Sequence, residues 1–204
     1  MAGGLRLDGR SAWLGASALL AAGALPGWFV PSPLWDWQPT LAFREPWRML
    51  TAAWVHWSPL HLGGNLVATA LVAIFGVAAR VPARVALAWL LAWPLTHIGL
   101  LLQPALLHYG GLSGVLHAGV AVAALWLLVR EVGRRRALGA AIATGLLIKI
   151  ILEEPWGPPL RAPAGLLSGG WDIATAPLAH ATGAAAGVLC ATLALWASAR
   201  QSSR

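Results

Sequence analysis

The chain is organised around Gly110-Gly111-Leu112-Ser113-Gly114-Val115-Leu116-His117, a segment that opens a long apolar run near the middle of the sequence. A serine with glycine close on either side is an unusual start for such a run. Because Gly111 and Gly114 have no Cβ, another backbone or a bound molecule can approach Ser113 closely. A serine hydroxyl becomes a nucleophile when a base lies beside it. Ser113 is therefore the candidate nucleophile, and its partners must come from the rest of the chain.

The composition indicates a membrane protein with several spans. Hydrophobic residues make up 58% of the 204 residues, charged residues make up 10%, and the mean hydropathy is +0.69. A water-soluble protein could not keep so much apolar surface out of water. The net charge of +7 is spread between the apolar runs, which is typical of topology signals and argues against nucleic-acid binding. The single Cys190 excludes an internal disulfide and a cysteine-based metal cluster.

Six apolar runs predict an all-α polytopic membrane protein with six transmembrane helices in a single domain, residues 1–204. Each run has about the 17–25 residues that cross a bilayer. The predicted helices occupy residues 11–30, 61–79, 85–102, 112–130, 136–152 and 177–199. The first run also has features of a signal peptide. We favour a retained helix, because it makes the span count agree with the charge pattern.

The connection over residues 31–60 differs from the apolar runs in its prolines and tryptophans. Its prolines at 31, 33, 39, 46 and 59 exclude a single regular helix. Its tryptophans at 35, 37, 47, 54 and 57 favour the membrane–water interface. We therefore predict an interfacial loop on the outer side of the membrane.

Arginine placement predicts that both termini are cytoplasmic. With six spans, the segments on the side of the N-terminus hold Arg6, Arg10, Arg80, Arg84, Arg130, Arg134, Arg135, Arg136, Arg200 and Arg204. The opposite side holds only Arg44, Arg48 and Arg161. Positively charged residues accumulate on the cytoplasmic side of membrane proteins. The predicted localisation is a cytoplasmic membrane with the outer loop facing away from the cytoplasm.

This topology places several polar side chains at one depth beneath the outer surface. Ser113, His180 and His61 each lie near the outer end of a predicted helix, and Asn65 shares a helical face with His61. Polar groups at that depth are costly when they face lipid, so they should face the interior of the bundle. Gly183 and Gly187 have the GxxxG spacing that lets two membrane helices pack closely. That packing would draw the helix of His180 against the helix of Ser113.

The residue types point to acyl-transfer chemistry. A histidine can take the serine proton near neutral pH and return it to a leaving amine. An asparagine amide, a histidine N–H and the backbone N–H of Ser113 could stabilise the oxyanion. Asp172 is the acidic residue nearest to His180 in sequence, but it lies in the preceding loop. We therefore predict a Ser113–His180 dyad without an acidic third member.

Other hydrolase classes do not fit the sequence. The G-x-S-x-G elbow of α/β-hydrolases requires glycine where Val115 stands. The chain has no HExxH zinc motif and no aspartate pair within the predicted spans. We expect neither a metal nor another cofactor. His56, His97 and His108 are interpreted as structural.

These motifs, in this order, resemble the rhomboid family of intramembrane serine proteases. Residues 111–114 match its GxSG, residues 56–65 match its H-x4-H-x3-N, and residues 179–187 match its AHxxGxxxG. Pro46-Trp47-Arg48 resembles the Trp-Arg pair of its first outer loop. The resemblance implies a six-helix bundle. It also implies roles for nine residues: Ser113 as nucleophile, His180 as base, His61 and Asn65 at the oxyanion, and Gly111, Gly114, His117, Gly183 and Gly187 as support.

One departure from the common rhomboid pattern points to a particular branch of the family. Rhomboids commonly carry tyrosine four residues after the serine, stacked on the catalytic histidine, and here His117 takes that position. This feature resembles the rhombosortase branch, which is linked in bacteria with proteins that bear a C-terminal Gly-Gly tail of motif, apolar helix and basic end. Three roles stay open for His117: stacking on His180, tuning its basicity, or filling space.

The resemblance implies an intramembrane endopeptidase of the bacterial inner membrane whose active site opens to the periplasm. It would cleave transmembrane anchors of membrane-bound or exported proteins near their outer end, with or without transfer to another acceptor. Its partners would be those transmembrane segments and the lipid bilayer. The alternative is a non-catalytic relative that binds client helices. A transporter is disfavoured, because no inverted repeat is visible.

Overall fold

The computed structural model describes residues 8–162 and 172–202, and all regular elements within these ranges are helices. The six predicted helices are present, with ends that differ from the prediction by a few residues. They are α1 (Gly9–Gly27), α4 (Pro59–Ala78), α5 (Ala83–Ile98), α6 (Ser113–Arg130), α7 (Gly133–Leu152) and α8 (Pro177–Ser202). A short 3-10 turn, η3 (Gly99–Leu102), continues α5.

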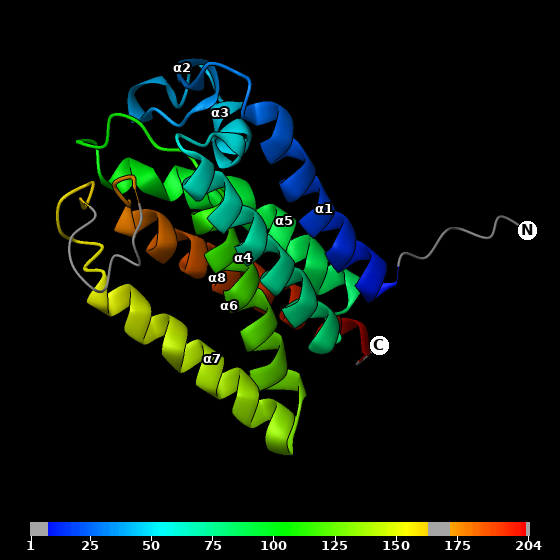
Figure 1. The fold of residues 1–204 in the computed structure, drawn as a ribbon. Coiled ribbons are helices and arrows are strands. Elements are labelled where there is room, and N and C mark those ends of the chain that lie inside the picture. The colour runs from blue at the N-terminus through cyan, green and yellow to red at the C-terminus, as the bar shows by residue number, and fades with distance from the viewer. Residues whose placement is uncertain (1–7, 163–171, 203–204) are drawn as a thin grey trace, which may run out of the picture.

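Residues 28–58 form a folded cap on one end of the bundle (Figure 1). Its regular elements are α2 (Ser32–Trp35), η1 (Pro39–Leu41), α3 (Arg48–Thr51) and η2 (Ala52–Trp54). The prolines prevent a longer helix, as the sequence predicts. Figure 1 places the described start of α1 and the described end of α8 at the opposite end of the bundle.

Helix α6 lies at the centre of the molecule and packs against α4, α5, α7 and α8. Helix α1 packs on α4 and α5, and α7 lies on the flank, mainly against α6 (Figure 1). Gly139 is the one fully buried residue of α7. The site residues of α4, α6 and α8 are therefore carried by mutually supported helices, whereas α7 has a large exposed face.

Tryptophans pair with glycines in the core of the bundle. The rings of Trp13 and Trp89 are 4.5 Å apart, and their indole N–H groups donate to the carbonyls of Val72 and Val115, at 3.0 and 2.8 Å. A Cβ on Gly76 would lie 1.9 Å from the Trp13 ring. A buried indole N–H usually has an acceptor, and for Trp13 and Trp89 a helical carbonyl supplies it.

Trp37 differs from the other tryptophans of the cap in its burial. Trp47 and Trp57 are about half exposed, but Trp37 is completely buried. Trp37 and Tyr109 exchange two backbone hydrogen bonds of 2.7 and 2.9 Å, and both side chains belong to a small core beneath the cap. The cap is thus a folded unit with its own apolar interior, and that interior encloses the Trp37 ring.

Four helices are long and apolar enough to cross a membrane, in the part of the chain that the structure describes. They span Pro59–Ala78, Ala83–Leu102, Ser113–Arg130 and Pro177–Ser198. Helix α7 does not meet this criterion because it carries Arg134, Arg135, Arg136 and Lys149. Helix α1 does not meet it either, because glycine, serine and Arg10 lower its mean hydropathy. The chain is therefore a multi-pass membrane protein with four candidate spans.

Candidate active site

Ser113 is the first residue of α6, where a tight backbone turn delivers it. Gly111 has a φ of +119°, a conformation that residues with a side chain rarely adopt. Its N–H donates to the carbonyl of Ala52 at 2.9 Å, which ties the turn to the cap. Ser113 itself is half-buried and faces a cavity of about 480 Å³. The turn thus fixes the backbone of Ser113, and the cavity leaves room beside its hydroxyl for a bound chain.

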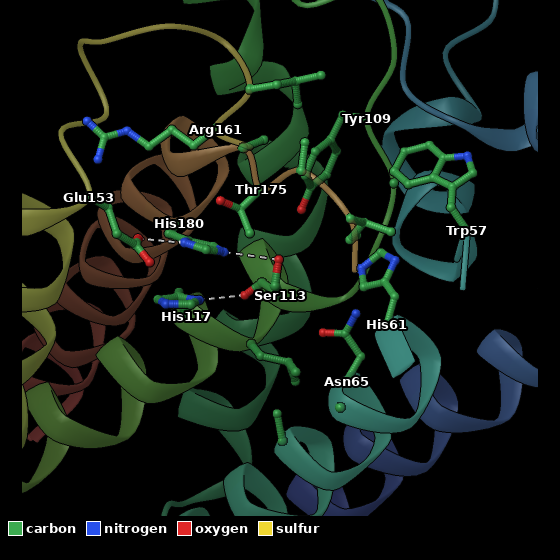
Figure 2. A pocket seen from close by; sticks show the side chains of 18 of the residues that line it. Trp57, His61, Asn65, Tyr109, Ser113, His117, Glu153, Arg161, Thr175 and His180 are labelled. Atoms are coloured by element: carbon green, nitrogen blue, oxygen red, sulfur yellow. Dashed lines mark hydrogen bonds and ion pairs between the residues drawn. The ribbon is translucent and has the colours of Figure 1, made fainter. Parts of the chain in front are cut away.

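His180 lies against Ser113, as the matched depths predict. Its Nε2 is 3.1 Å from the Ser113 Oγ (Figure 2). The glycine spacing in α8 explains this approach, because a Cβ on Gly183 would lie 2.0 Å from the carbonyl oxygen of Gly114. A Cβ on Gly187 would lie 2.5 Å from the carbonyl oxygen of Ala118. The predicted close packing of these two helices is confirmed.

His61 and Asn65 lie across the cavity from His180, with Ser113 between them (Figure 2). Both side chains are buried in α4. The Nδ1 of His61 and the Nδ2 of Asn65 have no hydrogen-bond partner among the described residues. A buried donor without an acceptor is unfavourable, so an oxygen that accepted from it would be bound well. This is the arrangement that an oxyanion site requires.

Gly111 also makes room for these donors. A Cβ on Gly111 would lie 2.6 Å from Nε2 of His61 and 3.4 Å from Nδ2 of Asn65. Gly114 has a comparable constraint, because its Cβ would lie 2.8 Å from the carbonyl oxygen of Ala179. Both glycines of the GxSG motif are therefore needed for close approach, as predicted.

His117 stacks on His180, with ring centroids 4.1 Å apart and planes inclined by 14°. Its Nδ1 is 2.6 Å from the carbonyl oxygen of Ser113. Since a carbonyl can only accept, Nδ1 must carry the proton. Of the three roles left open by the sequence, the structure shows the stacked arrangement, and the backbone contact anchors that ring to the first turn of α6.

The expectation of a site without an acid disagrees with the structure. Glu153, the residue after α7, places its Oε2 2.7 Å from Nδ1 of His180 (Figure 2). Asp172 instead accepts from the Ser58 hydroxyl at 2.7 Å, at the start of α4. Glu153 is 27 residues from His180 in sequence, so a search for the acid nearest along the chain considered only Asp172 and led to the predicted dyad. The sequence did offer one indication of Glu153: it directly follows the predicted helix 136–152, at the same outer end of the bundle as Ser113 and His180.

Lys149 and Tyr109 are two further cavity residues that the sequence did not single out. Lys149 forms an ion pair with Glu153, one helical turn later. The hydroxyl of Tyr109 donates to the carbonyl of Gly111 at 3.3 Å and accepts from the N–H of Gly114 at 3.4 Å. Tyr109 thus braces the turn on both sides of Ser113.

The remaining histidines, interpreted as structural from the sequence, contact backbone carbonyls or a carboxylate, and His108 also lines the cavity. The Nδ1 atoms of His56 and His97 bond backbone carbonyls, and that of His108 lies 2.6 Å from a carboxylate oxygen of Asp36. Burial lowers the pKa of His56 to about 4, against the opposing effect of its bond to the Trp54 carbonyl. These groups hold the cap and its junction with the helices.

Arg48, from the Trp-Arg pair, is the central charge of the cap. It is buried and bonds the side chain and the carbonyl of Asp36, at 3.1 and 2.8 Å. Its Nε also donates to Glu45 at 2.6 Å. A buried guanidinium with two carboxylates is fully paired, so this residue joins distant parts of the cap to one another.

The described residues therefore bring Ser113 and His180 into contact, with donors opposite and an acid behind the histidine. The rhomboid domain family matches residues 44–197, a range that contains the cap residues from Arg44 onward and every site residue named above. A comparison with curated proteins finds no significant match. The match covers most of the chain, and the chain belongs to the rhomboid domain family, a family of intramembrane serine proteases.

Proposed function

We propose that this protein is an intramembrane serine endopeptidase in which Ser113 is the nucleophile and His180 the general base. The observation that carries the proposal is the 3.1 Å contact between His180 Nε2 and Ser113 Oγ beside a cavity of about 480 Å³. A serine within hydrogen-bond reach of an imidazole is the minimal activated nucleophile. The family match supports the same chemistry.

In the proposed reaction, the Ser113 Oγ attacks the scissile carbonyl carbon and its proton passes to Nε2 of His180. The carbonyl oxygen becomes an oxyanion that accepts hydrogen bonds from Asn65 and His61. The C–N bond then breaks, and the His180 proton moves to the leaving amine. Attack by water or by an acceptor amine on the acyl group, with His180 as base again, releases Ser113.

We further propose six spans in one membrane domain, residues 1–204, by adding α1 and α7 to the four candidate spans. Ten arginines would then lie on the side of the termini and three on the side of the cap, which supports cytoplasmic termini. The cap and the cavity mouth would face the periplasm of a bacterial inner membrane. Labelling of single cysteines on each side of the membrane tests this orientation.

The substrates we propose are transmembrane anchors cut near their outer end, and more specifically the C-terminal Gly-Gly tails of exported proteins. The support is the rhombosortase-like His117 and its stacked position on His180. Small residues weaken a substrate helix and expose its peptide bonds. Mass spectrometry of the product of a tailed reporter would distinguish hydrolysis from transfer to an acceptor.

The first test is labelling of the purified protein with a fluorophosphonate probe, followed by peptide mapping. We expect an adduct on Ser113 that is absent from the Ser113→Ala and His180→Ala proteins. A co-expressed tailed reporter should be cut by the unchanged protein and by neither variant. Cleavage by Ser113→Ala would refute the proposal. A folded protein that binds the reporter but neither labels nor cuts it would instead be a client-binding relative.

A further inference from the structure

Behind the imidazole of His180, on the side away from Ser113, lies the carboxylate of Glu153 (Figure 2). We propose that Glu153 is a positioning residue for the Ser113–His180 pair, holding the imidazole with its proton on Nδ1 and its lone pair on Nε2. This inference rests on the proposed function, and it replaces the predicted dyad by a Ser113–His180–Glu153 arrangement.

Hydrogen-bond chemistry determines the tautomer. An ionised carboxylate only accepts, so the 2.7 Å contact requires that Nδ1 of His180 donates to Oε2 of Glu153. A neutral imidazole then has its only lone pair on Nε2, the atom 3.1 Å from Ser113 Oγ. The serine hydroxyl must donate to it. Both hydrogen bonds form only in the tautomer whose Nε2 lone pair can accept the serine proton.

His180 and Lys149 together keep the carboxylate in its accepting form. Burial acts to raise the pKa of Glu153, but hydrogen bonds and charges from His180 and Lys149 outweigh it and lower the pKa to about 2. The Lys149 Nζ is also 3.4 Å from Nδ1 of His180. Because both groups are donors in this protonation state, they share the two oxygens of Glu153 without bonding each other.

Among the residues that the structure describes, the charged and titratable groups that face His180 come from the end of α7 and the start of α6. Lys149 lies in the last turn of α7 and Glu153 directly follows that helix, whereas Ser113 and His117 belong to the start of α6. His180 is 7% exposed, so water has little access to its ring. Helix α7 packs mainly on α6 and touches α8 only lightly. The Glu153–His180 bond is thus a specific polar link from the end of α7 to the base.

A purely structural ion pair would hold α7 near α8 without affecting the basicity of His180. The two roles predict different pH–rate profiles. Glu153 stabilises the imidazolium that forms when the serine proton is transferred, and Lys149 opposes it. The acid limb is the low-pH part of the pH–rate profile, where the labelling rate rises as His180 loses its proton. Removing the carboxylate should therefore shift the acid limb to lower pH. Removing the ammonium should shift that limb to higher pH.

The test measures the second-order rate of Ser113 labelling by a fluorophosphonate probe from pH 4.5 to 9. The variants are Glu153→Gln, Glu153→Asp and Lys149→Met, and the matched control is Glu154→Gln. Glu154 is the adjacent acid, but it pairs with Arg161. Thermal denaturation in the same detergent shows that each variant is folded.

We expect Glu153→Gln to lower the labelling rate by about 100-fold and to shift the acid limb down by about one pH unit. The loss is smaller than the roughly 10⁴-fold effect of the aspartate-to-asparagine change in a serine-protease triad. The Glu153 side chain is 28% exposed, so water can replace part of its contact. Glu153→Asp should recover most of the rate and keep the acid limb, and Glu154→Gln should match the unchanged protein.

A Glu153→Gln protein with an unchanged rate and acid limb would overturn the inference. If that variant does not fold, Lys149→Met decides: an acid limb that stays in place or moves to lower pH would also overturn it. Failure of the proposed function has a different signature. In that case the unchanged protein gives no Ser113 adduct, or Ser113→Ala still cleaves the tailed reporter.

Discussion

Replacing Gly183 by alanine should separate the candidate nucleophile from its base without altering either side chain. The new Cβ would lie 2.0 Å from the carbonyl oxygen of Gly114, and Cβ atoms do not come within 3.0 Å of such atoms. Because the oxygen belongs to a helix backbone, α8 must move away from α6 by about 1 Å. His180 lies one turn before Gly183 and moves with it.

That displacement exceeds what the catalytic contact tolerates. The present 3.1 Å between His180 Nε2 and Ser113 Oγ would grow to about 4 Å, beyond hydrogen-bond reach. A misplacement of about 1 Å reduces rates by about 100-fold, which corresponds to about 2.7 kcal/mol of activation free energy. The overpacked contact should also lower the free energy of unfolding by about 1–3 kcal/mol.

The assay is cleavage of a tailed reporter together with the Ser113 labelling rate, both in detergent and in liposomes. Gly145→Ala is the matched control, because a Cβ at that position of α7 meets nothing within 4 Å. The control should keep full activity and unchanged or slightly higher stability. A folded Gly183→Ala protein that labels at the normal rate would refute the packing argument.

Three further predictions concern the oxyanion donors, the cap and the end of α7. Asn65→Ala should leave the protein folded and lower the cleavage rate by about 10²–10³-fold, because one donor to the oxyanion is lost; a loss below tenfold would remove Asn65 from that role. Arg48→Ala should lower the free energy of unfolding by about 3–5 kcal/mol, because Asp36 stays buried without the guanidinium that pairs with it; the exposed Arg44→Ala is the control in a denaturant titration. The pKa of Glu153 falls from 4.5 to about 2 on folding, so its contribution to stability is complete above pH 4.5 and is lost as the pH falls toward 2. Hydrogen exchange of residues 149–157, corrected for intrinsic rates, should loosen only in that window, and Glu153→Gln should remove the pH dependence.

The sequence alone determined the helices and most of the candidate site. Hydropathy is a property of each residue and its near neighbours, so runs of apolar residues located α1, α4, α5, α6, α7 and α8 without any tertiary information. Helix direction then placed Ser113, His180, His61 and Asn65 at one depth. The glycine spacing around Gly183 predicted which helices would pack closely, because only missing side chains allow that approach.

Only the tertiary structure decided which polar side chains meet. Whether Glu153 or Asp172 contacts His180 depends on the rotation of α7 about its axis and on the path of the connection before α8, and neither leaves a periodic trace in the sequence. The burial of Trp37 has the same origin, since composition favours the interface while the packing of the cap against Tyr109 encloses the ring. Depth in the membrane follows from local composition. The contacts that orient a base follow from the rotation and tilt of packed helices, which depend on residues from every part of the chain.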